Sequence, residues 1–158
     1  MESSLPTASA PLRVLLAEES LPFRRLIREA LVSFRGCQVD ETPSAERAFE
    51  MALSRPYQLF IFALTLPDMS GILLDRLLSR AYPLAHPGSH TAPPLIFMVR
   101  GEDSATHPNL TRNARVRGVL PYPPKLDLLL ALTMGLLPDT LPPLPPFLSP
   151  PAPPPHVP

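Results

Sequence analysis

The chain has 158 residues, which suits a single domain with some tail to spare. Its fourteen Lys and Arg balance fourteen Asp and Glu, so no overall electric field draws it toward nucleic acid or an anionic membrane. The single cysteine, Cys37, excludes an intramolecular disulfide and is typical of a reducing compartment.

The sequence predicts a cytoplasmic protein with no membrane contact. The first twelve residues lack a basic segment followed by an apolar one, so no secretory signal peptide is expected. The longest apolar-rich segment, 126–137, contains Asp127 and is shorter than the roughly 20 residues needed to span a bilayer.

Proline is distributed unevenly and divides the chain. Eleven of the 25 prolines fall within 138–158, where they exclude helices and sheet ladders and favour a disordered polyproline-II tail. We therefore expect a flexible N-terminus over 1–11 and a folded domain over 12–137. The tail has P-x-x-P spacing without a basic anchor, which favours a passive spacer over a docking peptide. No DNA-binding helix pair is expected after the domain, so no nucleic-acid partner is predicted.

The first predicted elements are a strand over 12–17 and a long amphipathic helix. Ser20 is a candidate N-cap for this helix, and Gly36 is a candidate residue just beyond its end. Apolar side chains recur at the spacing of a single helical stripe. These residues are Phe23, Leu26, Ile27, Ala30, Leu31 and Phe34.

The next predicted elements are a weak strand over 37–42, which begins at Cys37, and a helix over 45–54. Ser44 is the candidate N-cap of that helix. The apolar run over 57–63 predicts a strand buried on both faces, as central parallel strands are. Cys37 is interpreted as a buried structural thiol.

The following segment begins with a turn over 67–71 and a helix that ends near Ala81. A long loop over 82–94 and an apolar strand over 95–99 come next. Pro108 interrupts the apolar period that follows, so the segment 102–117 receives no assignment.

A short strand over 118–122 and an apolar helix over 125–137 complete five strand–helix units. Such alternation predicts a parallel sheet with right-handed crossovers. Five units in this length fit the flavodoxin-like doubly wound α/β fold, a three-layer sandwich with strand order 2-1-3-4-5. The loops after its first and third strands should meet at the topological switch point.

Parts of this pattern resemble the receiver domain of response regulators in two-component signalling. The segment 14–31, VLLAEESLPFRRLIREAL, resembles the family's first strand, acidic pair and first helix. The segment 58–72, QLFIFALTLPDMSGI, resembles its central strand and turn. Tyr122-Pro123 stands where the family has Lys-Pro. The resemblance covers roughly 12–137 and implies a protein partner, such as a histidine kinase or another regulator.

The resemblance also implies a phosphorylation site, most of which this chain lacks. In the family, a strand-end Asp accepts a phosphoryl group, an acidic pair holds Mg²⁺, and a Lys and a Ser or Thr contact the phosphate. By position, Ala63 replaces the acceptor Asp, Val99 replaces the Ser or Thr, and Tyr122 replaces the Lys. None of the three supplies the required nucleophile, hydroxyl or cation. Only Glu18 and Glu19 are retained, and as longer acids they imply at most weak Mg²⁺ binding.

Residues near this site are candidate substitutes for the missing groups. Asp68 is the nearby carboxylate that could accept phosphate, although hydrogen bonding to the turn backbone is the preferred interpretation. Lys125 is expected to open the last helix and point elsewhere. Pro123 matches the family's cis-proline position. His86 and His90 stand in a loop without a second pair at zinc spacing, so no metal site is predicted.

These observations predict a pseudo-receiver that is not an enzyme, signals without phosphorylation and works by protein–protein interaction. The family's signalling face would here include Val119, Leu120 and 126–137. The last helix is apolar on more than one side, so it either is deeply buried or offers an interface, which could form a homodimer. Two alternatives stay open. One is a receiver phosphorylated at Asp68, and the other is a small-ligand sensor that uses the vacated pocket.

Overall fold

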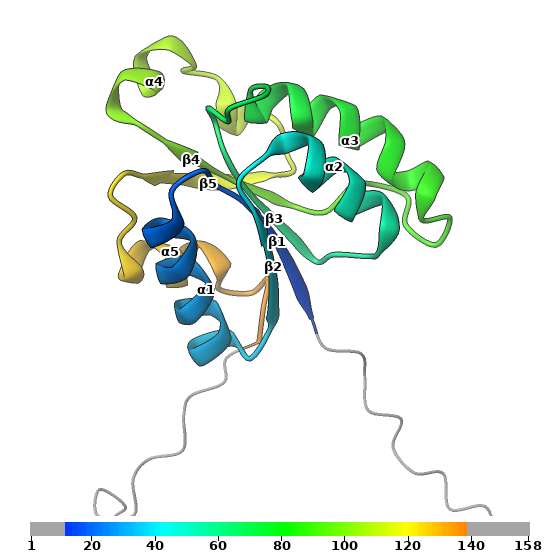
Figure 1. Cartoon of the computed structure of the whole chain (residues 1–158), viewed down its shortest axis with the longest axis horizontal. Helices are drawn as coiled ribbons and strands as arrows, with labels where there is room; N and C mark the ends of the chain where they lie inside the picture. The colour runs from blue at the N-terminus through cyan, green and yellow to red at the C-terminus, as the bar shows by residue number, and fades with distance from the viewer. Residues whose placement is uncertain (1–11, 139–158) are drawn as a thin grey trace, which may run out of the picture.

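The computed structural model describes residues 12–138 and shows a five-stranded parallel sheet (Figure 1). The strand order is β2-β1-β3-β4-β5, which confirms the predicted flavodoxin-like topology. The expectations for the N-terminus, 1–11, and for the proline-rich tail beyond residue 138 lie outside the described residues. The strands are β1 Arg13–Ala17, β2 Gln38–Thr42, β3 Leu59–Ala63, β4 Leu95–Val99 and β5 Val116–Pro121.

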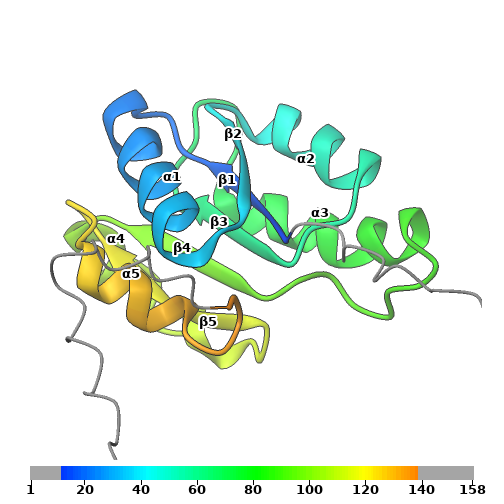
Figure 2. The ribbon, with the colours of Figure 1, turned by 90° about the horizontal axis from the view of Figure 1, so that it is seen from below.

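Helices cover both faces of the sheet. One layer contains α1 and α5, and the other contains α2 and α3, as Figure 2 shows from below. No helix in residues 12–138 is long and apolar enough to cross a membrane. The helices are α1 Leu21–Arg35, α2 Ala45–Ser54, α3 Gly71–Ala85, α4 Gly101–Thr106 and α5 Leu126–Thr133, with a short 3₁₀ helix, η1, at Leu110–Arg112.

The central strand β3 connects the two halves of the core. All five of its residues are buried, because it lies between β1 and β4 with a helical layer on each face. Phe60 and Phe62 pack in the α2–α3 half. Leu59 and Ile61 pack in the α1–α5 half together with Cys37, whose burial raises the pKa of its thiol.

The last turn of α3 differs from the sequence-based expectation. The helix continues to Ala85, so the loop predicted over 82–94 begins only at His86. The Tyr82 hydroxyl accepts a hydrogen bond from the Tyr57 backbone N–H at 2.9 Å, and a ring nitrogen of His86 lies 2.7 Å from the Ala52 carbonyl oxygen. These tertiary contacts stabilise a turn that sequence propensity disfavours.

The chain after β4 also differs from the expectation. The unassigned segment 102–117 contains most of α4 and all of η1, and β5 begins at Val116 instead of residue 118. The last helix ends at Thr133 instead of 137. Gly135, with a φ of +79°, is in the left-handed region that commonly follows a helix end.

The end of α5 is fixed by a buried cation from α1. The Arg35 guanidinium donates hydrogen bonds to the Leu130 carbonyl oxygen and to Thr133 Oγ1, the latter at 3.1 Å. Carbonyls in the last turn of a helix lack intrahelical donors. Arg35 therefore caps α5 and joins it to α1.

Candidate functional site

The predicted site residues lie at the carboxyl edge of the sheet. Parallel register places Ala63 beside Met98, one residue before Val99, and pairs Val99 with Pro121. Ala63 and Val99 are each 1 % exposed. The edge where the family would carry its acceptor and phosphate-reading groups is therefore apolar at these two positions.

Glu18 and Tyr122 are in direct contact across this edge. The Tyr122 hydroxyl donates a hydrogen bond to Glu18 Oε2, and the Ser20 backbone N–H donates to Glu18 Oε1 at 2.9 Å. The Glu18 side chain is buried, with only 2 % of the residue exposed. Each carboxylate oxygen of Glu18 therefore already has a donor from the protein.

The surroundings of Tyr122 keep its hydroxyl protonated. Desolvation raises the pKa of Tyr122 well above its usual range, and the hydrogen bond to Glu18 and that group's negative charge raise it further. The ring lies 5.4 Å from the Phe23 ring, centroid to centroid. The Arg100 guanidinium carbon lies 5.3 Å from the Tyr122 ring centroid, within the range of a cation–π contact. The Tyr122–Pro123 peptide bond is cis.

The two acids after β1 point in different directions. Glu18 is buried, whereas Glu19 is exposed. The Arg24 guanidinium stabilises the backbone that follows β1, because it donates hydrogen bonds to the carbonyl oxygens of Glu18 at 2.7 Å and Glu19 at 2.8 Å. The sequence suggests that the two carboxylates could bind one metal ion together, but in the fold one side chain is buried and the other is exposed.

These residues do not fit a Mg²⁺ site. The ion favours near-octahedral coordination by carboxylates and waters, whereas here one acid is buried and hydrogen-bonded and the other points outward. Within residues 12–138, no group of three or more His, Cys, Asp or Glu side chains could hold a metal ion.

Asp68 caps a distant helix. Its Oδ1 accepts a hydrogen bond from the Ala45 N–H at 2.9 Å, and its Oδ2 accepts one from the Glu46 N–H at 2.7 Å. Burial alone would raise the pKa of this carboxyl group, but backbone hydrogen bonds, led by those of Ala45 and Glu46, outweigh it and lower the pKa. The turn-backbone bonds expected from the sequence also contribute, from the N–H groups of Asp68 and Met69.

Two other residues of the turn after β3, Ser70 and Gly71, determine how α3 begins. Ser70 Oγ accepts a hydrogen bond from the Leu73 N–H at 3.1 Å and caps α3. A Cβ atom at Gly71 would overlap the Ala63 carbonyl oxygen, so only glycine allows α3 to begin this close to β3. The turn that resembles a phosphorylation loop is therefore accounted for by capping and close packing.

The remaining candidate residues stay apart from this edge. Lys125 occupies the N-cap position of α5 and is exposed. His86 contacts the end of α2, and His90 is exposed in the loop that follows. Sequence reasoning missed the roles of Arg24 and Arg100, because an arginine that contacts carbonyls or an aromatic ring leaves no local sequence signal.

Comparison with known proteins identifies the fold. No protein-family model matches the chain, and no curated protein matches it in sequence. Solved structures do match. The receiver domain of AraT, a response regulator from Geobacillus stearothermophilus, superposes with a TM-score of 0.65 and 20 % identity, covering 80 % of this chain and 93 % of the other.

Other similar structures carry different names. The signal receiver domain of an HD domain-containing protein from Pseudomonas fluorescens Pf-5 has a TM-score of 0.64 and 21 % identity, covering 84 % of this chain and 92 % of that domain. An adenylate cyclase from Rhodopirellula baltica has a TM-score of 0.63 and 17 % identity, covering 80 % and 88 % of the two chains. Together with the strand order and the helical layers, these similarities show that the chain has the receiver-domain fold.

Proposed function

We propose that this chain is a receiver-like signalling module that acts through protein–protein contact, without phosphorylation and without catalysis. The observation that carries the proposal is the hydrogen bond from the Tyr122 hydroxyl to the buried Glu18 carboxylate. Glu18 stands where the family resemblance places a metal-binding acid, and Tyr122 where it places the phosphate-binding lysine. The two residues contact each other and leave no acid–cation pair facing a phosphoryl group.

The position of the acceptor supports the same proposal. Ala63 has only a methyl group and is 1 % exposed, so an acyl phosphate has no oxygen on which to form. Asp68, the alternative acceptor, uses both carboxylate oxygens at the N-terminus of α2. Its phosphorylation would convert one of these oxygens into the bridging oxygen of an acyl phosphate and so weaken a hydrogen bond that caps that helix.

The structure narrows the surface on which a partner could bind. Of the residues expected on the signalling face, Leu120, Leu129 and Leu137 are buried, so their side chains are not available to a partner. Leu126 is 41 % exposed and Met134 is 70 % exposed. We place the contact on the outer side of α5, for a histidine kinase, another regulator or a second copy of this chain.

Incubation with acetyl phosphate and Mg²⁺, followed by intact mass measurement, tests phosphorylation independence. We expect no adduct of about 80 Da, the mass of a phosphoryl group. An authentic receiver domain treated in parallel provides the positive control. A stoichiometric, base-labile adduct that disappears in Asp68→Asn would contradict the proposal and favour the atypical acceptor.

Sedimentation velocity over a range of protein concentrations tests the contact surface on α5. If a second copy is the partner, the association should weaken in a Met134→Glu variant and persist in an Arg80→Glu variant on the opposite helical layer. Association that is equally strong in both variants would place the interface elsewhere.

A further inference from the structure

Two neighbouring pockets lie between α3 and the segment that joins β4 to β5. Their volumes are about 330 Å³ and 340 Å³. Ile72, Arg76 and His107 line both pockets and form a shared wall. Neither pocket is lined by Glu18 or Tyr122, so both differ from the site at which the family resemblance places phosphate chemistry.

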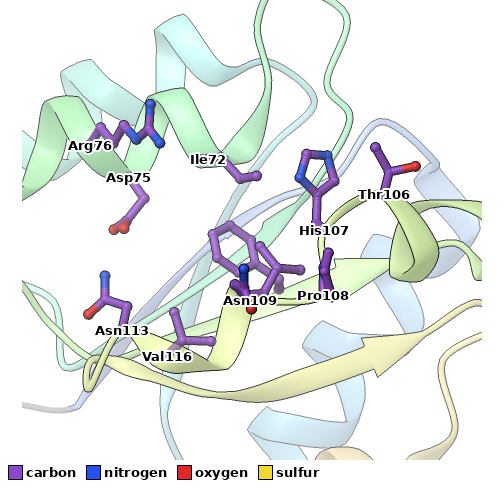
Figure 3. Close-up of a pocket in the computed structure, with 11 residues that line it drawn as sticks. Ile72, Asp75, Arg76, Thr106, His107, Pro108, Asn109, Asn113 and Val116 are labelled. Carbon is purple, nitrogen blue, oxygen red and sulfur yellow. The ribbon is translucent and has the colours of Figure 1, made fainter.

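The first pocket combines an apolar interior with polar groups at one end. Phe97 and Val116 line it but are only 3 % and 7 % exposed. The apolar surface open to a ligand therefore comes from the half-buried Ile72 and Leu110. Figure 3 shows the Asp75 carboxylate and the Asn113 side chain pointing toward each other across the pocket. A flat apolar group could lie against the Ile72 and Leu110 side chains, where burial of apolar surface favours binding.

The charges around this pocket favour an anion. Asp75 is buried, but Arg115 Nη2 lies 2.9 Å from its Oδ1 and offsets its charge. Arg76 is exposed, and within residues 12–138 its guanidinium has no hydrogen-bond or ion-pair partner. The shared wall therefore presents one unmatched cation, with the His107 imidazole as a second hydrogen-bonding group.

We propose that the first pocket binds a small organic acid with a flat apolar body. Its carboxylate would pair with Arg76, and its ring would pack on Ile72 and Leu110. A guanidinium recognises a carboxylate through two parallel hydrogen bonds. The pocket volume of about 330 Å³ is at the small end of ligand sites and suits a single ring. This proposal goes beyond the protein-contact function and does not depend on it.

A titration of ¹⁵N-labelled full-length chain with benzoate tests this proposal. Benzoate should produce saturable shifts in the backbone amide signals of His107, Asn113 and Val116, with a dissociation constant of about 1 mM, typical of a fragment. Benzamide tests the charge and acetate tests the ring, and neither should saturate over the same range. No saturable shift with about 20 mM benzoate would overturn the proposal, as would benzamide binding equal to that of benzoate.

A pair of arginine variants on α3 provides the matched test. Arg76→Gln should weaken benzoate binding about tenfold, because it removes a charge-assisted pair. Arg80→Gln, also exposed and one helical turn farther along α3, should change binding less than twofold. Unchanged melting temperatures would show that both variants fold. Equal affinities of the two variants would exclude Arg76 as the carboxylate partner and overturn the assignment. The phosphodonor experiment does not depend on either result.

Discussion

The Asp68 carboxylate caps the N-terminus of α2 by accepting hydrogen bonds from the Ala45 and Glu46 N–H groups. Asp68 belongs to the turn after β3, which lies 23 residues after Ala45 in the chain. The Asp68 side chain therefore links the turn beside Ala63 to a helix on one face of the sheet. Substitutions in this turn should destabilise α2 before the other helices.

Replacing Asp68 should therefore destabilise the fold without any phosphate present. We expect Asp68→Ala to lower the free energy of unfolding by about 1 kcal/mol, the usual cost of losing an N-terminal cap. Urea denaturation followed by circular dichroism measures this change. Ser44→Ala, which removes the helix's own cap, provides a matched comparison. An unchanged midpoint in Asp68→Ala would mean that the cap contributes nothing measurable.

The same contact predicts a pH dependence. The pKa of Asp68 is lower in the folded chain than its usual value of 3.8, so the ionised carboxylate is the form that stabilises the fold. Its contribution is present above about pH 4 and is lost as the pH falls through the lowered folded value. The stability difference between wild type and Asp68→Asn should therefore shrink in acid. A constant difference from pH 7 to pH 3 would contradict this prediction.

Removing the Tyr122 hydroxyl should leave a buried acid with one oxygen unpartnered. We expect Tyr122→Phe to cost about 1–3 kcal/mol of unfolding free energy, while the ring contacts with Phe23 and Arg100 persist. A thermodynamic cycle with Glu18→Gln isolates the coupling between the two groups. Strict additivity in this cycle would show that the hydrogen bond has no net energetic effect.

Introducing a carboxylate at position 63 alone should not make the protein phosphorylatable. Ala63→Asp places a carboxylate at a position that is 1 % exposed, and Glu18 remains bound to the Tyr122 hydroxyl. We expect a less stable protein that acetyl phosphate and Mg²⁺ leave unmodified. Stoichiometric modification of this single variant, seen by intact mass, would show that the Tyr122–Glu18 contact does not block the site.

Arg35 caps α5, so it should slow amide hydrogen exchange in that helix in particular. Arg35→Met keeps much of the apolar stem but removes the hydrogen bonds to Leu130 and Thr133. Amide hydrogen exchange should accelerate in α5 more than in β3, because the loss affects the helix end first. Equal acceleration in both elements would indicate that Arg35 supports the whole core and not the α1–α5 contact in particular.

The sheet was predictable from the sequence because its signals are local. Apolar runs such as 57–63 and the periodic stripe from Phe23 to Phe34 repeat over short distances, and five strand–helix units fit few topologies. The position of Ala63 at a strand end follows from the same pattern. These features depend on neighbouring residues, which a sequence displays directly.

The polar contacts were not predictable in the same way. Arg35 reaches Thr133 across 98 residues, and Tyr122 reaches Glu18 across 104. In both cases the partner is chosen by the packing of the folded chain, and neither residue belongs to a short motif. The last turn of α3 was not predicted for the same reason, because it is stabilised by hydrogen bonds with Tyr57 and Ala52, which belong to other segments.

The turn from Pro67 to Gly71 has a broader consequence. Asp68 and Ser70 each cap a helix, and Gly71 permits a close approach to β3. These contacts stabilise the turn whether or not the strand end beside it carries a reactive group, and in this chain Ala63 has only a methyl group there. The resemblance of this loop to a phosphorylation loop therefore carries no information about the reactive residue beside it, because Asp68, Ser70 and Gly71 each have a structural role.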